Sequence, residues 1–193
     1  MHIGLFGGSF NPIHNAHIAL ARTICEQAEL DEVWFLVSPQ NPLKQQSTLL
    51  AEEKRLDMVR IALKNEPRLK ASDYEFHLER PSYTWNTLQH LHADFPNYEF
   101  SLIIGGDNWA LFPHWAHYED ILRTHNIIIY PREDANIDAD SLPENVRLVH
   151  TPKINITSTL IRSLIAEGKD FSGFVPENVE KEITTKGYYI TKR

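Results

Sequence analysis

The stretch "GGSFNPIHNAH", residues 7–17, decides how the chain begins to fold. It follows the apolar run "HIGLF", residues 2–6, which predicts a strand. It precedes "IALARTICEQA", residues 18–28, whose apolar side chains recur at helical spacing. A second apolar run, "EVWFLV", occupies residues 32–37. The order of strand, helix and strand predicts a βαβ unit with parallel strands.

The same alternation continues along the chain. Further strands are expected at residues 69–76, 100–104, 126–130 and 146–150, and further helices at residues 49–63, 84–92, 118–123, 157–167 and 176–185. This order predicts a single α/β domain over residues 1–193, a Rossmann-like, doubly wound, mostly parallel sheet with helices on both faces. Ligands of such sheets bind beyond the carboxyl ends of the strands, so the loops there are the candidate site.

Composition narrows the class of protein. A chain of 193 residues can bury a sizeable core without disulfides. Cys25 is the single cysteine, so no intrachain disulfide can form, which favours a cytoplasmic protein. The net charge of −7 argues against a nucleic-acid partner. The sequence offers no apolar segment of membrane-spanning length, so no membrane association is expected. A small anionic ligand fits this composition, and homo-oligomerisation is left open.

The opening stretch is suited to holding an anion. It is neither G-x-x-x-x-G-K-[ST] nor G-x-G-x-x-G, so neither familiar phosphate fingerprint applies. Gly7 and Gly8 nevertheless let backbone N–H groups approach an anion closely, and the start of the next helix adds unpaired N–H groups. His14 and His17, three residues apart, are expected near the helix entrance. Imidazole N–H groups there would suit phosphate oxygens that gain charge during a reaction.

A zinc site and ordinary capping of the helix by polar side chains are the two alternatives for this histidine pair. Zinc needs a third and usually a fourth ligand at suitable spacing. The pair His114 and His117 repeats the spacing but follows an unrelated strand, and neither cysteines nor an H-E-x-x-H pattern accompany it. We therefore expect no metal ligands among the protein side chains.

Two motifs at opposite ends of the chain resemble one known family. "GGSFNPIHNAH" resembles the GGxFDPxHxGH signature of the nucleotidylyltransferase superfamily, and "INITSTLIR", residues 154–162, resembles its second signature, I-S-x-T-x-[IV]-R. "SPQNPLK", "ERPSYTWNT", "IIGGDNW" and "FPHWAHYEDIL" follow the order found in bacterial nicotinate-nucleotide adenylyltransferases. The two end motifs are specific for the superfamily, and the segments between them select the subfamily.

The resemblance implies a reaction. Nicotinate mononucleotide would attack the α-phosphorus of ATP in line, giving nicotinate adenine dinucleotide (deamido-NAD) and pyrophosphate in NAD biosynthesis. No enzyme nucleophile is needed, so catalysis would rest on positioning and charge stabilisation. Mg²⁺ would be the cofactor, bound mainly through the ATP phosphates.

The resemblance also implies site residues. His14, His17, Lys44 and Arg162 would be catalytic. The implied ATP site consists of Gly8, Ser9, Phe10, His14, His17, Asp107, Arg132, Ser158, Thr159 and Arg162. The implied nicotinate mononucleotide site consists of Lys44, Tyr83, Thr84 and Trp115, with Trp115 stacking on the pyridine ring and the backbone of Tyr83 and Thr84 binding the carboxylate.

Five positions depart from the family pattern. Asn11 stands where Asp is usual, Ala16 and Arg80 where Gly is usual, Thr157 where Ser is usual, and Leu43 where His is usual. Thr157 retains a hydroxyl able to cap a helix. Leu43 removes a histidine that would precede Lys44, so any phosphate contact of that side chain is lost.

The residues alone also allow other interpretations of the site residues and of the whole protein. Apart from the resemblance, Lys44 reads as a solvated loop cation, Trp115 as a packing residue and Asp107 as a turn cap. Arg162 could equally pair with a surface carboxylate. For the whole protein, the rivals are the same chemistry on nicotinamide mononucleotide or phosphopantetheine, and a noncatalytic nucleotide-binding regulator.

Overall fold

The computed structural model describes residues 1–39, 49–132, 137–151 and 155–190. The strands are β1 (His2–Gly8), β2 (Glu32–Val37), β3 (Leu69–Ser72), β4 (Glu99–Gly105), β5 (Asn126–Tyr130) and β6 (Val146–Leu148). The helices are α1 (Asn15–Gln27), α2 (Glu52–Ala62), α3 (Thr84–Asp94), α4 (Gly106–Leu111), α5 (Tyr118–Thr124), α6 (Ser158–Ala166) and α7 (Glu177–Lys186), with short 3-10 helices η2 (Tyr74–His77), η3 (Phe112–His114) and η4 (Ala139–Ser141).

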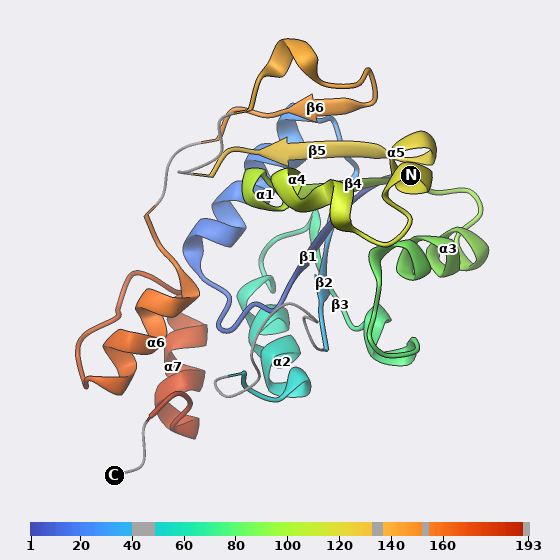
Figure 1. Ribbon diagram of the computed structural model, residues 1–193. Coiled ribbons are helices and arrows are strands. Elements are labelled where there is room, and N and C mark those ends of the chain that lie inside the picture. The colour runs from blue at the N-terminus through green and yellow to red at the C-terminus, as the bar shows by residue number, and fades with distance from the viewer. Residues whose placement is uncertain (40–48, 133–136, 152–154, 191–193) are drawn as a thin grey trace.

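The six strands form one sheet in the order β3-β2-β1-β4-β5-β6, and each neighbouring pair is parallel. Figure 1 shows the strong twist that carries β1, β2 and β3 away from the direction of β5 and β6. The order reverses between β1 and β4, because the chain returns to the centre after building one half of the sheet. This confirms the predicted doubly wound, Rossmann-like arrangement.

Successive side chains of each strand pack alternately into two hydrophobic cores, one on each face of the sheet. Phe6 of β1 packs in the core that includes α1, α2, α6 and α7. Ile3 and Leu5, on the opposite face of the same strand, pack in the core that includes α3, η3 and α5. Buried strands of a parallel sheet read as continuous apolar runs for this reason. Among the described residues, no helix is long and apolar enough to cross a membrane.

The strand expected over residues 146–150 ends at Leu148, and the structure differs from the sequence expectations at three further places. The strand expected over residues 69–76 ends at Ser72, because η2 turns Glu75 inward to accept a hydrogen bond from Thr87 Oγ1 at 3.0 Å. The helix expected from residue 49 begins at Glu52. The preceding segment is held open instead, with Leu50 N–H donating to Asn11 Oδ1 at 3.2 Å. α4 and η3 were not predicted, since six and three residues are too few to display a helical period.

Arg55 of α2 is fully buried and joins three segments at the carboxyl edge of the sheet. Its guanidinium donates to the carbonyls of Ser9 (2.6 Å), Ser38 (2.8 Å), Pro39 (3.1 Å) and Leu50 (2.8 Å). Burial lowers the pKa of Arg55, although carbonyl acceptors satisfy the donors. One side chain therefore fixes the turn after β1, the end of β2 and the approach to α2 relative to one another.

Replacing Arg55 by Met should destabilise the fold strongly. The substitution leaves four carbonyl groups without their donor, so the free energy of unfolding should fall by about 3–5 kcal/mol. Arg60→Met is the matched control, because Arg60 lies on the same helix with a half-exposed side chain paired to Asp57 and Asp73. The free energy of unfolding of that variant should stay within about 1 kcal/mol of the value for the original chain. Urea denaturation measures the free energy of unfolding of both variants. Equal losses would contradict the conclusion that the Arg55 guanidinium holds the three segments together.

Candidate active site

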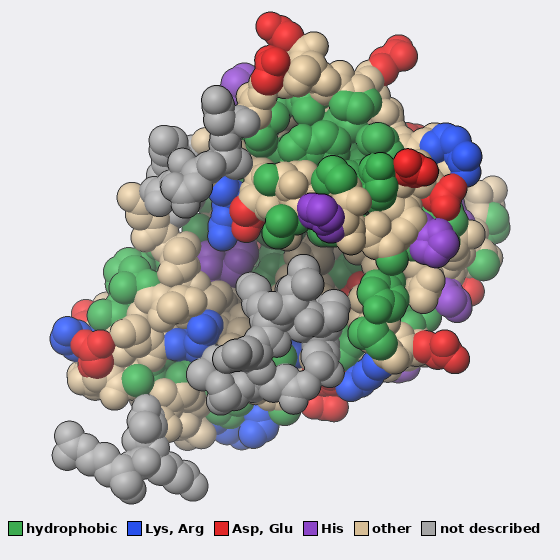
Figure 2. Space-filling model, in the orientation of Figure 1, with side chains coloured by type: hydrophobic (Ala, Val, Ile, Leu, Met, Phe, Trp, Pro, Cys, Tyr) green, Lys and Arg blue, Asp and Glu red, His purple; other side chains and the backbone are tan. Residues whose placement is uncertain are grey.

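The candidate site lies where the strand order reverses. After β1 the chain passes to α1 on one face of the sheet, and after β4 it passes to α4 and η3, which belong to the other face. The carboxyl ends of two such strands leave a crevice between their loops. Figure 2 shows histidine side chains, with Lys or Arg side chains beside them, at the edge of a hollow in this view. The turn after β1, which carries the first motif, and the start of α6, which carries the second, meet in this region.

The turn after β1 is anchored through an aromatic ring. Phe10 has a positive φ of 44°, and its buried ring lies 5.6 Å from the ring of Phe6 and 5.2 Å from that of Phe35, between centroids. A Cβ at Gly8 would come within 2.9 Å of the Phe10 ring, so this position requires glycine. The Phe10 side chain thus belongs to the core, while the backbone of residues 8–10 forms the edge of the crevice.

His14 and His17 are brought together as predicted. Their rings stack with centroids 3.6 Å apart and planes 19° from parallel. The backbone N–H of His14 donates to Nδ1 of His17 at 3.3 Å. Because Nδ1 is the acceptor, the neutral His17 ring carries its hydrogen on Nε2. The opposite edge of this imidazole is therefore a hydrogen-bond donor.

His14 is buried in a way that keeps its ring neutral. Burial, with a smaller contribution from the charge of Arg132, lowers the pKa of His14 to about 3. Its Nδ1 is buried and, within the part of the chain that the structure describes, has no hydrogen-bond partner. A buried nitrogen without a partner is costly unless a ligand or water supplies one. The same side chain stands at the N-cap of α1, where it faces the backbone of His17 in a capping box.

Asp107 and Arg132 come from neighbouring loops. Asp107 lies in the first turn of α4, and Arg132 follows β5. Arg132 Nε lies 3.7 Å from Asp107 Oδ1, with both side chains about half exposed. A Cβ at Gly105 would come within 2.5 Å of the Asp107 carboxylate, so this glycine leaves room for it. Since Arg132 also acts on His14, both residues belong to the same crevice.

The second motif binds the backbone of the first. Thr157 caps α6 by accepting from Leu160 N–H at 3.1 Å, as its hydroxyl predicted. Ser158 Oγ then donates to the carbonyl of Pro12 at 2.9 Å. Arg162 donates to the carbonyl of Asn11 at 2.8 Å and to Thr159 Oγ1 at 3.3 Å. Segments 151 residues apart in sequence therefore form one structural unit.

The residues expected to bind nicotinate mononucleotide lie at the start of α3 and after η3. Thr84 is the first residue of α3, and Tyr83, 45% exposed, precedes it as the N-cap. Among the described residues, no side chain caps α3 and its first turn carries no acid. Trp115 packs 5.4 Å from Phe112, between ring centroids. Stacking of Trp85 on His117, 5.6 Å apart, joins α3 to the segment that carries Trp115.

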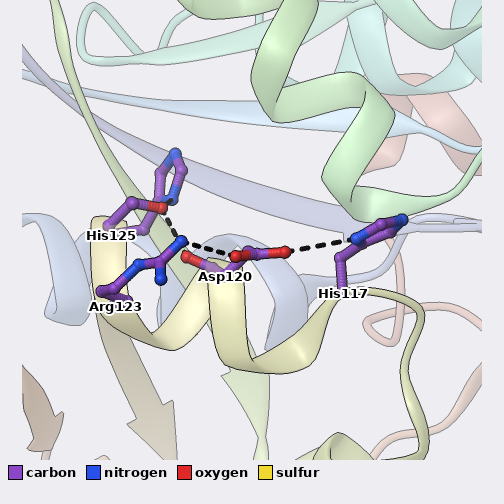
Figure 3. A network of polar contacts seen from close by, with 5 residues as sticks. His117, Asp120, Arg123 and His125 are labelled. Atoms are coloured by element: carbon purple, nitrogen blue, oxygen red, sulfur yellow. Dashed lines mark hydrogen bonds and ion pairs between the residues drawn. The ribbon is translucent and has the colours of Figure 1, made fainter.

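Residue His117 gives that segment a fixed conformation. It is the N-cap that precedes α5, with a positive φ of 59°. Its Nδ1 lies 3.3 Å from an oxygen of Asp120, whose other oxygen accepts from Arg123 at 2.6 Å. Figure 3 shows this chain of polar contacts along one side of α5. Lys44, by contrast, lies outside the described residues.

Known proteins resemble this chain over almost its whole length. The cytidylyltransferase-like family model matches residues 5–164. A probable nicotinate-nucleotide adenylyltransferase of Bacteroides thetaiotaomicron is 50% identical over 91% of this chain and 87% of its own length. A probable nicotinate-nucleotide adenylyltransferase of Cytophaga hutchinsonii is 44% identical over 98% of each chain.

The chain belongs to the nicotinate-nucleotide adenylyltransferases of the cytidylyltransferase-like family. A solved structure of the Plasmodium falciparum nicotinic acid mononucleotide adenylyltransferase complexed with NaAD shares the fold. Its TM-score is 0.82 at 23% identity, over 97% of both chains. The family resemblance of the two sequence motifs is thereby confirmed.

Sequence reasoning missed three polar residues of this adenylyltransferase fold: the buried Arg55 and Glu75 and the partly buried Tyr189. Glu75 is buried beneath the start of α3, where burial raises its pKa while hydroxyl groups of Thr87, Ser38 and Ser82 partly offset the rise. Arg55 shares a buried stripe of α2 with Met58 and Val59, and a charged residue on such a stripe was the available signal. Glu75 and Tyr189 gave no comparable signal.

Stability should depend on pH through His14. The unfolded chain protonates His14 near its ordinary pKa of 6.5, whereas the folded chain does so near 3. Unfolding therefore takes up a proton at pH values between these two pKa values. As pH falls through that window, the protonation of His14 in the unfolded chain lowers the free energy of unfolding. The loss approaches about 1.4 kcal/mol per pH unit. His14→Asn removes this dependence. The free energy of unfolding of the variant, minus that of the original chain, should therefore increase when the pH is lowered from 7 to 5, as measured by urea denaturation. A difference that is constant with pH would contradict the burial of a neutral ring.

Proposed function

We propose that this chain transfers the adenylyl group of ATP to nicotinate mononucleotide, forming nicotinate adenine dinucleotide and pyrophosphate in NAD biosynthesis. The observation that carries the proposal is the union of the two motifs: Arg162 and Ser158 bind the carbonyls of Asn11 and Pro12, beside the stacked histidines. An oxygen of the mononucleotide phosphate forms a bond to the α-phosphorus. The bond from that phosphorus to the bridging oxygen breaks, and pyrophosphate leaves with the electron pair.

The triphosphate would bind at the turn after β1 and the start of α1. Backbone groups of Gly8, Ser9 and Phe10 line this turn. In addition, the first turn of α1 contains no acidic residue that would oppose an anion. Arg132 and Arg162 supply positive charge from two other elements. Asp107 would bind a ribose hydroxyl, and Ser158 and Thr159 would assist at the start of α6.

His14 and His17 would stabilise the charge that develops on phosphate oxygens. His17 presents an Nε2–H donor because its Nδ1 is already occupied by the His14 amide. His14 has a buried Nδ1 whose partner a ligand could supply. Fixed donors in a poorly solvated site need no reorganisation during the reaction, which makes them effective. These two side chains therefore act by position rather than by covalent chemistry.

The acceptor would bind at the start of α3. The backbone N–H groups of Tyr83 and Thr84 lie at the start of α3 and would suit the nicotinate carboxylate, since a helix N-terminus favours an anion. An uncharged nicotinamide would gain less from the same groups. Trp115 would stack on the pyridine ring, and Lys44 would bind the mononucleotide phosphate.

Magnesium would enter as part of the ATP substrate. Among the described residues, no group of three or more His, Cys, Asp or Glu side chains is arranged to hold a metal ion. Mg²⁺ commonly keeps several waters and binds through substrate phosphates, so the site fits a magnesium–ATP complex. A single catalytic domain, a cytoplasmic location and a homo-oligomer remain predictions.

One assay tests the reaction and separates its rivals. The protein is incubated with ATP and Mg²⁺ and, in turn, with nicotinate mononucleotide, nicotinamide mononucleotide and phosphopantetheine. Pyrophosphate and the adenylylated product are both measured. Release with nicotinate mononucleotide well above the others is the expected result. Preference for another acceptor would overturn the substrate, and ATP binding without release would indicate a regulator.

His17→Ala should reduce turnover far more than ATP affinity. Loss of a donor to the transition state typically costs about 100-fold or more in kcat, whereas ground-state ATP binding should change by about threefold or less. His90→Ala is the control, because His90 is an exposed residue of α3. Steady-state kinetics and equilibrium binding of an ATP analogue measure the two quantities. Equal losses in both would contradict a transition-state role for His17.

A further inference from the structure

Tyr189, beyond the end of α7, has a backbone conformation that tyrosine rarely adopts. Its φ is 65°, in the left-handed region, two residues after Gly187, whose φ is 63°. Glycine adopts this region freely, but a bulky side chain there is uncommon. Such a conformation persists only when surrounding contacts enforce it, and such positions cluster at functional sites. The contacts of the Tyr189 side chain are therefore informative.

The hydroxyl of Tyr189 reaches the first motif. It donates to Asn11 Oδ1 at 2.9 Å, across 178 positions of sequence. The ring packs against the core that includes α1, α2, α6 and α7. Burial raises the pKa of Tyr189, and the nearby charges of Arg162 and Arg55 offset this only in part. The hydroxyl therefore keeps its proton and remains a donor.

Asn11 joins the contacts from both ends of the chain. It is 4% exposed, and its Oδ1 accepts from Leu50 N–H as well as from Tyr189. Its backbone carbonyl accepts from Arg162 at 2.8 Å. A displacement of Asn11 would move the acceptor that orients Arg162, together with the turn that carries Ser9 and Phe10. Tyr189 is thus linked through Asn11 to Arg162 and to the turn that is proposed to bind the triphosphate.

We infer that Tyr189 is a positioning residue of the ATP site. Its hydroxyl, through Asn11, holds the turn after β1 and the guanidinium of Arg162 in the arrangement that receives the triphosphate. This inference rests on the proposed function, in which that turn and Arg162 bind ATP. The Tyr189 ring anchors the C-terminal segment in the core, while its hydroxyl positions the ATP site through Asn11.

Tyr189→Phe separates these two contributions, because it removes one oxygen and keeps the ring. The KM for ATP should rise about fivefold, since one well-placed hydrogen bond is lost. The KM for nicotinate mononucleotide should stay within about twofold of the original value. Tyr188→Phe is the matched control. Tyr188 packs against the same core, and the Lys54 ammonium lies 5.3 Å from its ring centroid. This variant should leave both KM values unchanged.

A purely structural role for Tyr189 makes a different prediction. Tyr189→Phe would then lower the thermal unfolding midpoint while both KM values stay unchanged, and this result would overturn the inference. A parallel rise in both KM values would overturn it as well, because it would indicate general loosening of the protein.

A double-mutant cycle tests the route through Asn11. In an Asn11→Ala background, Tyr189→Phe should have no further effect on the KM for ATP, since the acceptor is already gone. A full fivefold effect there would overturn the route. If Asn11→Ala does not fold, Asn11→Asp provides a second background. Its carboxylate preserves the acceptor, so the effect of Tyr189→Phe should persist, and its disappearance would contradict the route.

Equilibrium binding keeps this test independent of the acceptor assignment. If the original chain releases no pyrophosphate with any acceptor, the proposed function fails. The affinity for a nonhydrolysable ATP analogue can still be compared between Tyr189→Phe and Tyr188→Phe. Weaker binding by Tyr189→Phe alone supports the inference, and equal binding overturns it.

Discussion

The guanidinium of Arg55 is the constraint on which the site depends. It is fully buried and donates to four backbone carbonyls from three segments. A guanidinium presents its donors in one rigid plane, so the carbonyls can be satisfied together only if the segments meet at fixed angles. The carbonyl of Ser9 is among them, which ties the proposed phosphate-binding turn to the end of β2 and the approach to α2. The apolar core positions the sheet, and this cation positions the loops.

A second set of contacts closes the turn from the other side. Arg162 binds the carbonyl of Asn11, Ser158 binds that of Pro12, and Asn15 N–H donates to the carbonyl of Phe174 at 2.9 Å. The turn after β1 is therefore held by α2 on one side and by the C-terminal helices on the other. An irregular turn has no ladder of its own to satisfy its carbonyls. The long-range donors do this, which explains why the two sequence motifs occur together although 151 residues separate their contacts.

The regular elements could be predicted, because their signal is local. The bounds of β2 and β5 follow directly from uninterrupted apolar runs, and the helix after the first turn follows from its apolar period. The meeting of His14 with His17 also follows from spacing alone. Arg55, Glu75 and Tyr189 could not be placed in the same way, because the partners that cover each of them, fully or in part, are distant in sequence. Ordinary propensity assigns such residues to the surface. The family resemblance supplied the roles of Arg162 and Ser158, but not the carbonyls they bind.

The electrostatics of the site oppose those of the whole chain. The chain carries a net charge of −7, yet the charge of Arg132 acts on the buried His14 ring and Arg162 binds the carbonyl of Asn11 in the turn after β1. Both arginines already have partners, Asp107 for Arg132 and the Asn11 carbonyl for Arg162. Asp107 offsets the charge of Arg132 in a half-exposed pair, whereas the Asn11 carbonyl carries no charge and does not offset that of Arg162. Positive potential therefore remains available to a polyanion. A neutral His14 adds a hydrogen-bonding group to the candidate site without adding a buried charge.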